Sequence, residues 1–136
     1  GHARQGSTRS PQWKGGGVVF APTPRDYTIN LNKKEKRIAL KSALTSRVLE
    51  NKFIVVDDFA MSEIKTKKMQ QTLNNLNVKK ALVVCAENEK NTVLSVRNIY
   101  GVKAASPKTI NVYDILKYNT VVASKDAVKT IEEVYA

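Results

Sequence analysis

The sequence has 136 residues, the length of one domain, and carries 23 Lys and Arg against 12 Asp and Glu, a formal net charge of +11. Such an excess indicates an anionic partner. The single cysteine, Cys85, excludes an intrachain disulfide and a cysteine-rich zinc site, the single histidine, His2, excludes catalytic triads and histidine metal clusters, and no apolar run approaches the roughly 20 residues that span a bilayer.

Residues 1–31 are predicted to form an extended basic arm that has no fold of its own. Residues 1–25 contain four Lys or Arg and no acid, and the arm holds five of the six glycines and the only tryptophan. Such a segment buries too little apolar surface to offset its backbone entropy. Four cations of the arm fit contacts to phosphates: Arg4, Arg9, Lys14 and Arg25.

Two features of the arm need separate interpretation. Trp13 either anchors the arm to the domain or stacks on a base or ribose, and its polar and glycine neighbours favour stacking. Gly15, Gly16 and Gly17 lack the spacing of a phosphate-binding loop. These glycines are better explained as backbone that approaches a partner closely.

The next segment, residues 32–50, is predicted to be a helix with Asn32 as its N-cap. Leu40, Ala43, Leu44 and Val48 fall on one face, and Lys34, Arg37 and Lys41 on a flank. Cations also crowd the first turns, where they oppose the helix dipole, and only Glu35 counters them. These residues either bind an external anion or are solvated lysines of a surface helix.

From residue 52 onward, apolar strands alternate with helices. Continuous apolar runs predict strands at 53–56, 81–85, 102–104 and 120–123. Periodicity predicts helices at 65–76 (Met69, Leu73 and Leu76 inward), at 89–98 with Gly101 as C′ residue, at 111–116, and after a Ser124 cap to the chain end. This order predicts an α/β domain over residues 32–136, with an open, mainly parallel four-stranded sheet and helices on both faces.

An acid pair, Asp57-Asp58, directly follows the first predicted strand. Acids at the carboxyl end of a parallel strand can hold magnesium or accept a phosphoryl group. That function needs a third carboxylate, for which Glu87 is arguable, and a lysine, for which Lys125 is suitably placed. Two solvated or helix-capping acids explain the pair more simply.

The whole chain resembles the bacterial large-subunit ribosomal protein L-four family. The resemblance is carried by residues 3–20, Ala-Arg-Gln-Gly-Ser-Thr-Arg-Ser-Pro-Gln-Trp-Lys-Gly-Gly-Gly-Val-Val-Phe, and continues through Pro-Thr-Pro-Arg at 22–25, Arg-Ile-Ala-Leu-Lys-Ser-Ala-Leu at 37–44, Leu-Ser-Val-Arg-Asn-Ile at 94–99 and Asn-Val-Tyr-Asp-Ile-Leu at 111–116. The sequence departs from the family pattern at Ala21, Val96 and Tyr100, none of which lies among the basic residues of the arm.

The resemblance implies a cytoplasmic, structural ribosomal protein without catalysis or cofactors. It implies that the arm is the returning half of a long loop that enters ribosomal RNA and helps line the peptide exit tunnel, and that a strand, a helix and the outgoing half-loop precede it. The implied partners are large-subunit ribosomal RNA, neighbouring ribosomal proteins and, near the loop tip, the nascent peptide. Some members of the family also bind messenger RNA as regulators, an alternative that stays open. The residues expected to bind RNA are Arg4, Gln5, Arg9, Gln12, Trp13, Lys14, Gly15, Gly16, Gly17, Arg25, Lys33, Lys34, Arg37 and Lys41.

Overall fold

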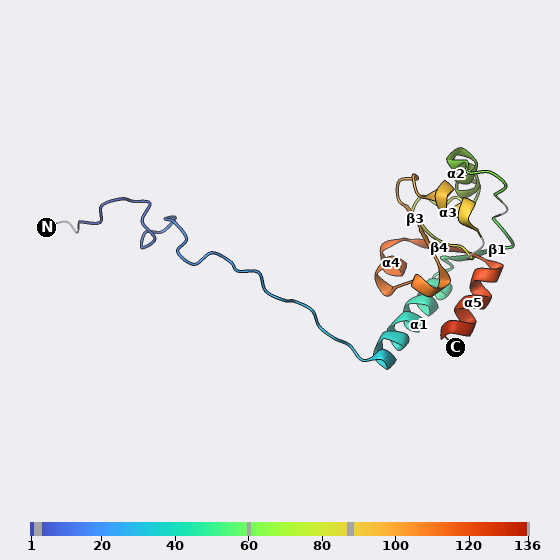
Figure 1. The fold of residues 1–136 in the computed structure, drawn as a ribbon, viewed down its shortest axis with the longest axis horizontal. Helices are drawn as coiled ribbons and strands as arrows, with labels where there is room; N and C mark the ends of the chain where they lie inside the picture. Colours follow the sequence, from blue (N-terminus) through green and yellow to red (C-terminus); the bar gives the residue numbers. More distant parts are fainter. Residues whose placement is uncertain (2–3, 60, 87–88, 136) are drawn as a thin grey trace. The chain divides into compact units, whose positions relative to one another are not determined.

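The computed structural model describes residues 1, 4–59, 61–86 and 89–135 of the chain. The chain divides into two units, Gly1–Asn30 and Leu31–Ala136, and every helix and strand that the structure describes belongs to the second (Figure 1). His2 and Glu87, which the sequence analysis considered, lie outside the described residues. None of the described helices is long and apolar enough to cross a membrane.

Helices and strands alternate along the whole length of the second unit. The described elements are α1 (Lys33–Leu49), β1 (Phe53–Val56), α2 (Thr66–Asn75), β2 (Ala81–Val84), α3 (Lys90–Val96), β3 (Val102–Ala105), a 3-10 turn (Pro107–Thr109), α4 (Val112–Lys117), β4 (Thr120–Ser124) and α5 (Lys125–Tyr135). The α/β fold expected from the sequence is therefore confirmed.

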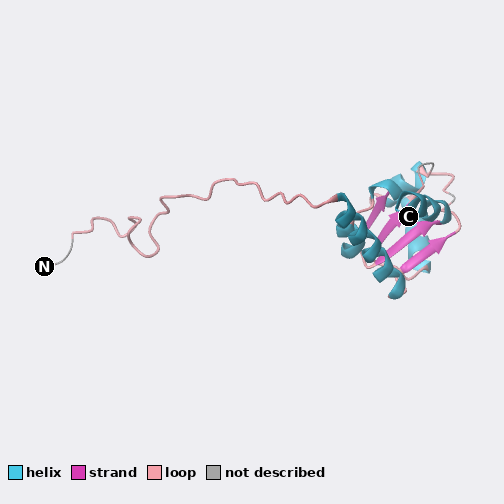
Figure 2. Cartoon of the chain, turned by 90° about the horizontal axis from the view of Figure 1, so that it is seen from below, coloured by secondary structure: helices cyan, strands magenta, loops and turns pink. Residues whose placement is uncertain are grey.

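The four strands form one parallel sheet (Figure 2). Their order in the sheet is β1-β4-β2-β3. The last strand in the chain, β4, lies between β1 and β2, and Val122 is the register partner of both Ile54 and Val83. Both central strands are buried on both faces, which explains why they are apolar without alternation. The edge strand β1 is less covered, since the Val55 side chain is half exposed.

Helices cover both faces of the sheet, as the sequence predicts (Figure 1). Leu82, Val84, Val121 and Ala123 pack against α1, α4 and α5. Ala81, Val83, Cys85 and Val122 pack against α2 and α3. Successive strand residues point to opposite faces, so each central strand serves both layers. Burial raises the pKa of the Cys85 thiol to about 12, which is consistent with an inert core residue.

Local predictions fail at several positions. Helix α3 ends at Val96, and Gly101, with φ of 78°, belongs to the turn before β3 and is not a helix C′ residue. Ser124 directly precedes α5, as predicted, but it is also the last residue of β4, and its hydroxyl donates to Glu89, 35 residues away. In α1, the predicted inward residue Val48 is 56% exposed, and its neighbour Arg47 is buried in its place.

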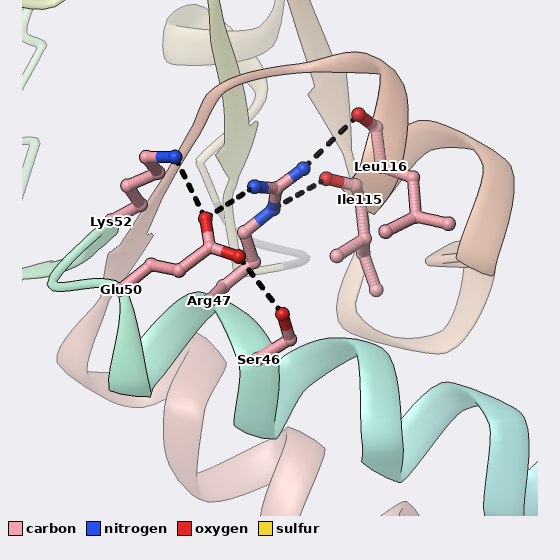
Figure 3. A network of polar contacts seen from close by, with 6 residues as sticks. All are labelled: Ser46, Arg47, Glu50, Lys52, Ile115 and Leu116. Atoms are coloured by element: carbon pink, nitrogen blue, oxygen red, sulfur yellow. Dashed lines mark hydrogen bonds and ion pairs between the residues drawn. The ribbon is translucent and has the colours of Figure 1, made fainter.

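Arg47 is buried because it satisfies the end of another helix (Figure 3). Its Nε donates to the Ile115 carbonyl at 3.0 Å, and one terminal nitrogen donates to the Leu116 carbonyl at 3.0 Å. These carbonyls belong to the last turn of α4, which has no intrahelical donor for them. The other terminal nitrogen lies 3.0 Å from Glu50, which also binds Lys52. The guanidinium thereby ties α1 to α4.

The other end of α4 is satisfied by its own cap. The Asn111 side chain accepts a hydrogen bond from the Asp114 amide at 2.8 Å, and the Asp114 carboxylate lies 2.6 Å from the Lys103 ammonium. Burial raises the pKa of Asp114, but the hydrogen bonds from Lys103 and Asn111 outweigh it and the pKa is lowered. A helix of six residues is too short to be stable alone, so these contacts hold it in place.

We predict that Arg47→Ala lowers the free energy of unfolding by about 2–4 kcal/mol, because it leaves one buried and one partly buried carbonyl without a charged donor. The stability of Arg47→Lys should lie between that of the parent protein and that of Arg47→Ala, because an ammonium lacks the forked geometry with which a guanidinium reaches both carbonyls. The control, Val48→Ala, should change stability by less than about 0.5 kcal/mol. Urea unfolding followed by circular dichroism measures all three, and a larger loss for Val48→Ala than for Arg47→Ala would contradict the assignment.

Candidate nucleic-acid interface

The first turn of α1 is fixed by its only acid. The amide of Asn32, the N-cap residue, donates to Glu35 Oε2 at 3.2 Å, and the Lys36 amide donates to the Asn32 carbonyl at 3.1 Å. The bond to Glu35 is the side-chain half of a capping box, and the Lys36 bond is the first backbone hydrogen bond of the helix. Glu35 therefore serves the helix end and forms no ion pair with a cation among the described residues.

Five cations project from this half of α1. All are exposed, and within the described part of the chain none forms an ion pair with an acid: Lys33, Lys34, Lys36, Arg37 and Lys41. Further along the helix, Leu40 and Ala43 are buried in the core. The positive end of the helix dipole adds to the charge of the cations. An anion at this end would meet both the side chains and unpaired backbone N–H groups.

The described residues of the arm form neither helix nor strand, but residues 7–17 close a turn that the sequence did not predict. The Gly17 amide donates to the Arg9 carbonyl and the Gly16 amide to the Trp13 carbonyl, both at 2.9 Å. A Cβ on Gly16 would lie 2.0 Å from the Ser10 carbonyl oxygen, so only glycine fits there. The turn also brings Gln5 and Gln12 together, with a side-chain hydrogen bond of 2.7 Å.

The cationic and aromatic side chains of the arm are accessible. Trp13 is 43% exposed, and Arg4, Arg9, Lys14 and Arg25 are exposed. The sequence analysis overlooked Tyr27, whose ring centroid lies 4.2 Å from the Arg25 guanidinium carbon. The signal for this pair is its i, i+2 spacing, which places two side chains on the same side of an extended chain. The arm thus presents accessible guanidinium and aromatic groups. The cations of α1 belong to the other unit of the chain.

The alternative site at Asp57 and Asp58 lies at the carboxyl ends of the strands. Asp57 and Lys125 are exposed, and Asp58 lines a cavity of about 740 Å³ together with Glu89, Lys90 and Asp126. Within the described residues, no three His, Cys, Asp or Glu side chains are grouped so that they could hold a metal ion. The described part of the chain therefore does not supply the carboxylate set that magnesium needs.

Glu89 is the chemically unusual group of this cavity. Its carboxylate accepts hydrogen bonds from the Ala86 amide at 2.9 Å and the Ser124 hydroxyl at 3.3 Å. Its pKa is raised, mainly by burial and also by the neighbouring Asp58 carboxyl, although the Ala86 and Ser124 donors oppose the shift. These contacts join the start of α3 to the ends of β2 and β4, so the structural role of Glu89 is evident without a ligand.

The sequence matches the profile of the Ribosomal protein L4/L1 family over residues 1–134. It is 66% identical over 136 residues to the large ribosomal subunit protein uL4 of Agathobacter rectalis, 64% to that of Lachnoclostridium phytofermentans and 56% to that of Thermoanaerobacter pseudethanolicus. Each alignment covers 100% of this chain and 66% of the relative. The chain thus spans about two thirds of the length of these curated relatives.

We predict that Glu89→Gln stabilises the protein at pH 7 and loses this advantage below about pH 4. A carboxyl whose pKa is raised on folding contributes stability below its ordinary pKa of 4.5, and this contribution is lost as the pH rises through the folded pKa. The neutral amide avoids that loss. Melting temperatures from pH 3 to 8 test this, with the exposed Glu132→Gln as control, and an equal shift at every pH would contradict it.

Proposed function

This chain belongs to the ribosomal protein L4/L1 family, and we propose that it is a structural, non-catalytic constituent of the large ribosomal subunit that binds ribosomal RNA. Two observations support this function. The relatives that match the entire chain are named large ribosomal subunit proteins. The chain also carries a net charge of +11, and the excess is greatest in residues 1–50, with 10 Lys or Arg against 3 Asp or Glu.

The observation that carries the proposal is the arrangement of charge at the start of α1. Lys33, Lys34 and Arg37 are exposed at the positive end of the helix, where they repel both one another and the dipole. The one neighbouring acid is hydrogen bonded to the helix cap. An RNA phosphate placed here would neutralise the cations and remove the repulsion.

The arm contributes a second kind of contact. Arg4, Arg9 and Lys14 neutralise phosphates, while the glycine backbone at 15–17 approaches RNA where side chains would clash. Gln5 and Gln12, which hydrogen bond to each other, present their remaining amide groups to RNA next to the turn. Trp13, together with the Arg25 guanidinium on Tyr27, offers flat faces on which unpaired bases stack.

In the cytoplasmic ribosome, this arm contributes to subunit assembly and to the lining of the peptide exit tunnel. Neighbouring ribosomal proteins and the nascent peptide at the loop tip are the further partners we propose. The same basic surface also suits a regulatory messenger RNA, because phosphate contacts carry no sequence information. A phosphoacceptor function at Asp57 and Asp58 is less well supported, since the described residues hold no metal-ligand cluster.

We predict that binding of in vitro transcribed large-subunit ribosomal RNA weakens steeply with salt, and that Arg4→Gln, Arg9→Gln and Lys14→Gln together reduce the slope of log affinity against log salt by about 2–3. The melting temperature should stay within about 1 °C, because these side chains are exposed. Filter binding between 50 and 300 mM KCl measures the slope. The control variant carries Lys90→Gln, Lys125→Gln and Lys129→Gln, which remove the same positive charge from the second unit. A slope near zero for the parent protein would contradict the proposed function.

A second prediction gives opposite signs for stability and binding. Lys33→Gln with Lys34→Gln should raise the free energy of unfolding by about 0.3–1 kcal/mol, because it relieves repulsion with the dipole, and should weaken RNA binding. Lys41→Gln, two turns further along the helix, is the control: it should weaken binding without the gain in stability. Urea unfolding and filter binding separate the two effects. If the double variant lost stability and kept its affinity, these lysines would have a structural role.

A further inference from the structure

Three turns that are far apart in the sequence lie together at the amino ends of the strands. The turn before β2 contains Asn77, Lys79 and Lys80, the turn before β3 contains Tyr100, and Asn119 precedes β4. The Thr120 amide donates to the Lys80 carbonyl, and the Ala81 amide donates to the Gly101 carbonyl at 3.2 Å. The parallel register thus joins these turns into one surface, which we name the amino edge (Asn77, Lys79, Lys80, Tyr100, Asn119).

The backbone that follows Tyr100 lies against the turn that carries the two lysines. Gly101 has φ of 78°, and a Cβ on it would lie 3.3 Å from the Lys79 carbonyl oxygen and 3.5 Å from Lys80 Cγ. Only a residue without a side chain allows this approach at that φ. Tyr100 is nevertheless 97% exposed, so packing does not account for an aromatic residue at this position.

The groups of the amino edge are available for binding. Both lysines are exposed, and neither forms an ion pair with an acid in the part of the chain that the structure describes. Asn77, Lys79, Lys80 and Asn119 line a depression of about 370 Å³, with Val78 and Thr120 and without an acidic residue. Cations and amides at this depression, with an exposed ring in the adjoining turn, form the set that proteins use for unpaired RNA.

The opposite edge of the sheet carries acids as well as cations. Asp58, Glu89 and Asp126 line the cavity at the carboxyl ends of the strands together with Lys90, and Asp126 also pairs with Lys129 at 3.2 Å. The depression at the amino edge is lined by lysines without an acid, so a polyanion is favoured there. The carboxyl end of α1 leads through Lys52 into β1 and so lies at the same edge of the sheet as the amino edge. The length of α1, about 25 Å, separates this end from Lys33 at the other end.

We propose that the amino edge is a second RNA-binding site, which takes an unpaired nucleotide of the RNA. A base stacks on Tyr100, Lys79 and Lys80 contact the flanking phosphates, and the amides of Asn77 and Asn119 hydrogen bond to the base or ribose. The site rests on the proposed function, because its ligand belongs to the same RNA. It adds a contact that reads the absence of base pairing, which phosphate contacts on α1 cannot do.

The test uses the full chain and in vitro transcribed large-subunit ribosomal RNA. Tyr100→Ala should weaken binding about 10-fold, the usual effect of removing one stacking platform. Lys79→Gln with Lys80→Gln should lower the slope of log affinity against log salt by about 1.4, corresponding to two phosphates of a single strand. Ultraviolet cross-linking followed by mass spectrometry of the peptides should map a nucleotide to Tyr100.

Matched variants separate this site from general charge and from the arm. Tyr113→Ala removes another exposed ring and Lys90→Gln with Lys125→Gln removes the same charge at the carboxyl edge, and both should leave affinity and slope unchanged. Equal melting temperatures verify the fold of each variant. The inference is overturned if the parent protein binds RNA, the amino-edge variants bind it equally well and no cross-link maps to Tyr100. The same result is expected if the amino edge binds an acidic protein instead of RNA. If the parent protein does not bind RNA, the proposed function itself fails.

Discussion

The central position of β4 is the constraint on which the rest of this structure depends. Residues 120–124 come last among the strands, yet they lie between β1 and β2 and hydrogen bond to both. Val121 and Ala123 face the layer of α1, α4 and α5, while Val122 faces the layer of α2 and α3. Without this strand, neither layer of helices has a complete sheet surface to pack against. Both cores therefore form through contacts between residues that are distant in sequence, which favours cooperative folding of the whole second unit.

The parallel register also sorts charge between the two ends of the sheet. All four strands run in the same direction, so the residues that precede them gather at one edge and those that follow gather at the other. Lys79, Lys80 and Asn119 precede strands and line a depression without an acid, whereas the acids Asp57, Asp58 and Asp126 follow strands, together with Lys125. Neither group is a cluster in the sequence. The polarity of the domain towards a polyanion is thus a property of topology and not of any contiguous motif.

The sequence predicted those features that depend on local pattern. Continuous apolar runs identified the strands, periodicity identified the helices, and their alternation implied the parallel sheet. Strand order could not be predicted, because nothing local states that residues 120–124 lie between 53–56 and 81–84. Arg47 shows the same limit: periodicity favours Val48 as the inward residue, but the carbonyls that bind Arg47 lie 68 and 69 residues away. For the candidate site, composition identified the arm and the start of α1, while the amino edge becomes evident only when three turns are brought together.

The start of α1 explains how a domain can keep an unfavourable charge arrangement that is useful for binding. Lys33 and Lys34 weaken the helix end by repulsion from its dipole, and their nearest acid would relieve this if it paired with them. Glu35 instead accepts a hydrogen bond from the Asn32 amide and so stabilises the helix start while the ammonium groups stay accessible. Further along, Leu40 and Ala43 pack in the core and Arg47 ties the helix to α4, so α1 does not rely on its first turn for stability. The repulsion remains unrelieved within the described chain, and it is available to strengthen the binding of an external anion.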